Sequence, residues 1–81
     1  MSSYSIIANL TDGRQLTATD YTKIVRARDL VAERVAQYGR DLVNVIVVRS
    51  DGGVATFSRG GRPADFDSRR MVETWLVEES R

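Results

Sequence analysis

The feature that most constrains the fold is an apolar, β-branched run at residues 42–48, which reads Leu-Val-Asn-Val-Ile-Val-Val. A shorter run follows at residues 54–57, after an Asp-Gly pair at residues 51–52. This order is typical of a β-hairpin, because glycine accepts the positive φ that the reversal requires. The first run is apolar on both of its alternating faces. It therefore predicts a central strand of a sheet, with other parts of the protein packed against each face.

The composition is that of one small folded domain, residues 1–81. Hydrophobic residues make up 42% of the chain and charged residues 28%, which is typical of a soluble globular domain. There is no cysteine and no histidine, so disulfides and thiolate metal sites are excluded and the most common general base is missing. The apolar runs are too short to span a membrane, and the first residues lack the layout of a signal peptide. We therefore expect a cytoplasmic protein without a membrane segment.

The formal net charge is only +1. Such a balance argues against a strongly basic nucleic-acid binder and against an acidic mimic of nucleic acid. Any electrostatic function must therefore depend on how the charges are distributed. Every basic residue except Lys23 is arginine, whose guanidinium group suits bidentate contact with carboxylate or phosphate.

The N-terminal part of the chain predicts a second hairpin. An apolar residue occupies every second position from Tyr4 to Leu10, which indicates a strand. A three-residue loop at residues 11–13, with Gly13 in the left-handed conformation, would follow it. This loop would pair Leu10 with Arg14, Ala8 with Leu16 and Ile6 with Ala18. A two-residue turn would scatter the apolar side chains over both faces, so the longer loop is favoured.

Residues 17–27 are compatible with two structures. Their β-branched and aromatic residues favour a strand that reaches about Val25, with a bulge near Asp20 and a helix over residues 29–38. Alternatively, Asp20 caps a longer helix that already includes this segment.

The apolar pattern favours the strand over the longer helix. The longer helix would bring Arg28 onto its apolar side and leave Leu30 on its polar side. Residues 29–38 are helical under both interpretations, and Gly39 ends the helix.

The last helix begins near Asp67, with Glu78 and Glu79 in solvent. The order ββαββα then predicts an α+β fold in which two helices pack on one face of a four-stranded, largely antiparallel sheet. The second face of the sheet, with Ile46 and Val48 or their opposites, is apolar and uncovered. We expect a second copy of the protein, or another partner, to cover it, and therefore expect a homodimer.

No set of residues matches a catalytic motif. The serines have no histidine to activate them. Asp65 and Asp67 are interpreted as helix caps rather than as ligands of a cation. Residues 51–53 lack the spacing and the Lys-Ser/Thr ending of a phosphate-binding loop, so they are interpreted as a turn. We therefore expect a protein that is not an enzyme and that uses neither a cofactor nor a metal.

The segment Arg59-Gly60-Gly61-Arg62 is the candidate partner-binding site. Two guanidinium groups flank a glycine pair, and this arrangement suits a phosphate or an acidic protein surface. The alternative interpretation is a flexible connection into the last helix. Lys23, Arg26 and Arg34 form a second candidate patch, in which Asp29 and Glu33 dilute the positive charge.

The segment at residues 24–33, Ile-Val-Arg-Ala-Arg-Asp-Leu-Val-Ala-Glu, is followed by a glycine and a hairpin. This layout resembles that of small phage-encoded inhibitor proteins, anti-CRISPR inhibitors among them. The resemblance is one of element order, without a signature motif, so no functional residue is carried over. It implies a stoichiometric protein inhibitor that acts without catalysis on a nucleic-acid-handling complex.

The sequence therefore predicts a non-enzymatic protein-interaction module with a protein partner. The alternative is a small nucleic-acid-binding protein that uses the Arg-Gly-Gly-Arg segment together with Lys23 and Arg26.

Overall fold

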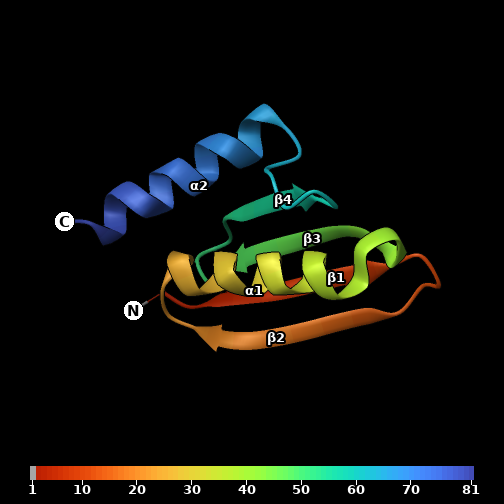
Figure 1. Cartoon of the computed structure of the whole chain (residues 1–81). Helices are drawn as coiled ribbons and strands as arrows, with labels where there is room; N and C mark the ends of the chain where they lie inside the picture. Colours follow the sequence, from red (N-terminus) through yellow and green to blue (C-terminus); the bar gives the residue numbers. More distant parts are fainter. Residues whose placement is uncertain (1) are drawn as a thin grey trace.

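The computed structural model describes residues 2–81 (Figure 1). The elements are β1 (Tyr4–Leu10), β2 (Gln15–Tyr21), α1 (Ile24–Tyr38), the short 3-10 helix η1 (Gly39–Asp41), β3 (Leu42–Arg49), β4 (Val54–Ser58) and α2 (Phe66–Glu79). The predicted order ββαββα is confirmed.

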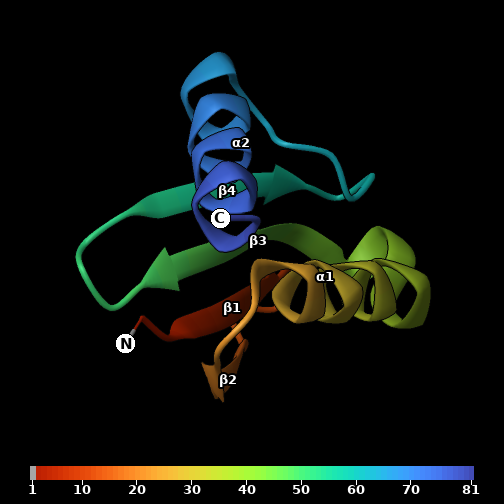
Figure 2. The same ribbon diagram turned by 90° about the vertical axis from the view of Figure 1, so that its left-hand side faces the viewer.

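The four strands form one antiparallel sheet in the order β2-β1-β3-β4. The β-branched run that starts at Leu42 is β3, and it lies between β1 and β4, as its two apolar faces predicted. Figures 1 and 2 show α1 lying over β1 and β3, and α2 lying over β4. The α+β fold predicted from the sequence is therefore confirmed.

The core lies between one face of the sheet and the two helices. That face carries the alternate residues Tyr4, Ile6, Ala8 and Leu10 of β1, Val45 and Val47 of β3, and Ala55 and Phe57 of β4, all of them buried. The helices contribute Ile24, Ala27, Leu30, Val31, Val72 and Trp75. The residues that alternate along the strands and the residues that share one side of each helix all lie in this single layer.

Both hairpins use the three-residue loop with glycine in the left-handed conformation. In the first, Leu10 N donates to Arg14 O at 2.9 Å, and Gly13 has φ +90°. The predicted pairs Ala8–Leu16 and Ile6–Ala18 are confirmed. In the second, Arg49 N donates to Gly53 O at 2.8 Å.

The predicted boundary between β2 and α1 was wrong. The strand ends at Tyr21 rather than near Val25, and the helix begins at Ile24, five residues before the expected start at Asp29. The predicted bulge near Asp20 is confirmed, since the β1–β2 register shifts there and Asp20 has φ +69°.

The physical reason for the longer helix is Ala27. This small residue is completely buried and lies at the centre of the apolar stripe of α1. Because Ala27 belongs to the apolar stripe, the stripe lies on the side of the helix that includes Leu30 and excludes Arg28. Leu30 is therefore buried and Arg28 is exposed. The conflict that favoured the strand therefore does not arise.

The start of α2 differs slightly from the prediction. Asp65 is the N-cap, because its Oδ1 accepts a hydrogen bond from Ser68 N at 2.7 Å, and the helix begins at Phe66. This bond holds the pKa of Asp65 below its usual value. The expected capping role of Asp65 is therefore confirmed, whereas Asp67, also expected to cap the helix, lies inside its first turn.

Candidate functional site

The Arg-Gly-Gly-Arg segment is a third hairpin and not a loose connection. Ser58 N donates to Arg62 O at 2.8 Å, and Gly61 N donates to Ser58 O at 2.9 Å. Gly61 has φ +82°, so it fills the place that glycine also fills in the two other hairpin loops. We call residues 58–62 the arginine hairpin. These hydrogen bonds hold its backbone in one conformation. The two arginine side chains therefore extend from defined positions.

The segment after the arginine hairpin continues the sheet. Phe57 pairs with Pro63 in an isolated antiparallel bridge, and Ala64 N donates to Thr56 O at 2.8 Å. Thr56 N donates to Ser68 Oγ of α2 at 2.9 Å. The outer edge of β4 is therefore covered, and the arginine hairpin projects from a well-paired part of the sheet.

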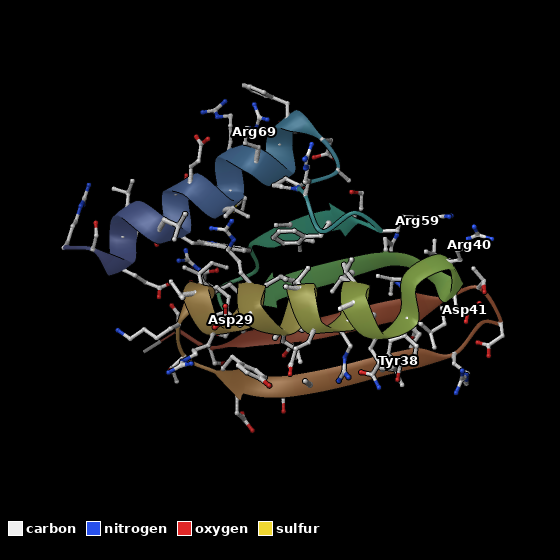
Figure 3. The ribbon with its side chains drawn as sticks, viewed as in Figure 1. Asp29, Tyr38, Arg40, Asp41, Arg59 and Arg69 are labelled. Carbon is white, nitrogen blue, oxygen red and sulfur yellow. The ribbon has the colours of Figure 1, made fainter. Side chains whose placement is uncertain are left out.

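Both arginines of the hairpin are free to bind a partner. Arg59 and Arg62 are exposed, and neither takes part in an ion pair within residues 2–81. A Cβ placed on Gly61 would lie 3.6 Å from Val35, so the hairpin packs beside the C-terminal half of α1. Figure 3 shows Arg59 and Arg40 at the same end of the molecule. Arg40, which follows α1, therefore adds a third guanidinium group to this end.

The structure does not bring the two predicted basic patches together. Lys23 precedes α1 and Arg26 lies in its first turn, whereas the arginine hairpin packs near Val35. Twelve residues of helix separate Lys23 from Val35, a distance of about 18 Å. Arg26 also lies 3.9 Å from the carboxylate of Asp29, in an exposed ion pair. Lys23 and Arg26 therefore lie at the other end of α1 from Val35, although Val25, the neighbour of Arg26, lines the same cleft as Gly61.

A shallow cleft of about 280 Å³ lies between α1 and the arginine hairpin. Val25, Arg28, Asp29, Val31, Ala32, Phe57 and Gly61 line it. Phe57 is buried and forms part of its floor, while Arg28 and Asp29 place opposite charges at its rim. The cleft therefore offers an apolar depression next to exposed arginines, which suits the side chain of a protein partner.

The opposite face of the sheet is uncovered and carries no charge. The strand registers place on it Ser5, Ile7 and Asn9 of β1, Gln15 and Thr17 of β2, Asn44, Ile46 and Val48 of β3, and Val54, Thr56 and Ser58 of β4. We call these residues the open sheet face. None of them is charged, although 28% of the chain is.

Sequence reasoning missed a polar cluster that joins the ends of the chain. Glu79 accepts a hydrogen bond from Tyr4 Oη at 2.6 Å and from Ile24 N at 2.9 Å. Lys23, the N-cap residue of α1, provides no capping side chain. The carboxylate of Glu79 caps the helix in its place. Burial and this hydrogen bond raise the pKa of Tyr4 to about 12. The expectation that Glu79 is solvated was therefore wrong.

Arg49 forms the second half of this cluster. Its guanidinium group lies 2.6 Å from Asp51, contacts Glu78 and stacks over the ring of Trp75 at 5.5 Å. The hydrogen bond to Asp51 raises the pKa of Arg49 and lowers that of Asp51. Glu78, also expected in solvent, is thus an ion-pair partner. These contacts tie α2 to the sheet, and the cluster is structural.

Three further findings bear on function. Between residues 2 and 81, no three acidic side chains come close enough to hold a metal ion. Neither helix of the described chain is long and apolar enough to cross a membrane. Comparison of the chain with models of known protein families, with curated proteins and with solved structures finds no match.

Proposed function

We propose that this protein is a cytoplasmic, non-enzymatic interaction module that binds an acidic surface of a larger protein through the arginine hairpin. One observation carries the proposal: Arg59 and Arg62 are exposed, without an ion pair among residues 2–81, on a hairpin that backbone hydrogen bonds hold in one conformation. Guanidinium groups form bidentate pairs with carboxylates. Because the hairpin is ordered before binding, less conformational entropy is lost when the complex forms.

A nucleic acid is the second candidate partner. The position of Arg40 at the same end of the molecule as Arg59 favours it, since guanidinium groups also bind phosphate. However, Asp41 directly follows Arg40, and Asp65 lies just after the hairpin. A phosphate backbone would meet these carboxylates, whereas protein interfaces commonly contain charges of both signs. We therefore favour the protein partner.

In its narrowest form, the proposal makes the protein a stoichiometric inhibitor, of the phage-encoded kind, of a nucleic-acid-handling complex. This form is supported by the resemblance in element order. It adds the expectation that the partner is a component of such a complex.

The test is affinity capture from the source cells, with and without nuclease treatment. The double variant Arg59→Glu and Arg62→Glu reverses two charges at the hairpin. Its matched control, Lys23→Glu and Arg26→Glu, makes the same change in net charge at the other end of α1. We expect a nuclease-resistant partner that the parent and the control retain and the hairpin variant loses.

Other outcomes contradict the proposal. Loss of the captured protein after nuclease treatment would favour the nucleic-acid alternative. Equal retention by both double variants would show that the arginine hairpin is not the binding site. Both double variants should remain folded, because all four side chains are exposed, and circular dichroism checks this.

A further inference from the structure

The open sheet face has an ordered arrangement of side chains. A polar row crosses all four strands, in which Gln15 Nε2 donates to Asn9 Oδ1 at 2.8 Å and Asn9 Nδ2 donates to Asn44 Oδ1 at 2.7 Å. Next to it, Ile7 pairs with Ile46, and Val48 pairs with Val54 on the adjoining row. The face thus has an apolar centre with a hydrogen-bonded polar border on one side.

From this arrangement we infer that the open sheet face is the surface on which two copies of this chain associate, face to face. This surface lies on the opposite side of the sheet from the helices, and the inference goes beyond the binding role proposed for the arginine hairpin. Three properties of the face identify the second copy as its occupant: its lack of charge, its area and the state of the sheet edges.

The lack of charge selects an uncharged partner surface. A charged side chain buried against Ile7 and Ile46 would remain unpaired, which is strongly unfavourable. Nucleic acid requires basic residues at the contact, and the open sheet face has none. A second open sheet face meets the requirement, because each copy presents the same neutral residues and the two apolar centres can pack on each other.

The area of the face is close to the lower limit for association. Four strands spaced about 4.8 Å apart and about seven residues long, at about 3.4 Å per residue, cover a flat area of about 450 Å². Two copies would bury about 900 Å² of flat area in total, to which the uneven surface of the side chains adds. Specific interfaces begin at about 1,000 Å². Two sheets that pack in this way form a sandwich, with the sheets about 10 Å apart.

The sheet edges offer less to a second copy. The edge of β4 is covered by residues 62–64 and by Ser68. The edge of β2 is interrupted by the bulge at Asp20. Both features oppose edge-to-edge pairing, whereas nothing in residues 2–81 covers the open sheet face.

The test is sedimentation velocity over a range of concentrations up to several hundred micromolar. The parent, with a chain mass of 9.1 kDa, should sediment as a dimer at tens of micromolar. Ile46→Asp should raise the dissociation constant about 100-fold or more, because it buries an unpaired carboxylate. Val54→Asp should act in the same way, and since Val54 is 49% exposed, it leaves the core intact.

The matched control is Val77→Asp, at an exposed valine of α2 on the helical side of the molecule. It should dimerise like the parent. A parent that remains monomeric at several hundred micromolar would overturn the inference. A dimer that persists in both Ile46→Asp and Val54→Asp would also overturn it and would place the contact elsewhere, for instance at the β2 edge. Neither result affects the test of the arginine hairpin.

Discussion

The contribution of Glu79 can be tested by replacing it with alanine. Its carboxylate accepts hydrogen bonds from Tyr4 Oη and from Ile24 N, and both residues are buried, at 1% and 0% exposure. In the variant Glu79→Ala, both donors lose their acceptor. The helix α1 also loses its only cap, since Lys23 provides none.

The expected loss follows from these two orphaned donors. A buried donor without a partner costs about 1–3 kcal/mol, so the variant, with two such donors, should lose about 2–6 kcal/mol. A domain of this length has a free energy of unfolding of about 4–12 kcal/mol. The midpoint of thermal unfolding should therefore fall by roughly 10–40 °C.

The assay is thermal and urea unfolding followed by circular dichroism. The control is Glu73→Ala, which removes an exposed carboxylate of the same helix that has no hydrogen bond or ion pair within residues 2–81. In a Tyr4→Phe background, Glu79→Ala should cost about 1 kcal/mol less, since one donor is already gone. If Glu79→Ala melts within about 3 °C of Glu73→Ala, an effect of only about 0.5 kcal/mol, the capping role is refuted.

Two further predictions concern the same cluster. Gly53→Ala should destabilise the protein by about 1–3 kcal/mol and alter tryptophan fluorescence, because a Cβ at Gly53 would lie 3.0 Å from the ring of Trp75; Gly60→Ala, whose Cβ meets nothing closer than 3.8 Å, should melt like the parent. The free energy of unfolding should fall between about pH 10 and 12, because the pKa of Tyr4 is about 12 in the folded state and about 10 in the unfolded chain. Below pH 10 this stabilisation is complete, and it is lost as the pH rises toward 12. When unfolding is measured across this range, the free energy of unfolding of Tyr4→Phe should decline less than that of the parent.

The parts of the fold that local sequence determines could be predicted. The β-branched run predicted the central position of β3, and Gly13 at the third position of its loop predicted the register of the first hairpin. The arginine hairpin follows the same pattern, with Gly61 at the third position of its loop. That pattern was the signal that would have distinguished a closed hairpin from a flexible connection.

The boundary of α1 could not be predicted from apolar residues of large size alone. Ala27 contributes little hydrophobic area, yet it is completely buried and lies on the same side of α1 as Leu30. The phase of the helix is thus determined by packing against β1 and β3, which periodicity in one segment does not show.

The polar cluster depends on contacts between distant parts of the chain. Tyr4 and Glu79 are 75 positions apart, and Arg49 and Glu78 are 29 positions apart. Acidic residues in the last turn of an exposed helix normally lie in solvent. Only the path of α2 across the sheet brings them to the N-terminus of α1 and to Arg49.

The most direct test of the proposed function is a calorimetric titration with the purified partner obtained by capture. The parent should bind at a fixed whole-number stoichiometry without turnover. The Arg59→Glu and Arg62→Glu variant should bind at least about 30-fold more weakly, equivalent to about 2 kcal/mol, and the Lys23→Glu and Arg26→Glu control should bind like the parent. An affinity of the hairpin variant equal to that of the parent would contradict the assignment of the arginine hairpin as the binding site.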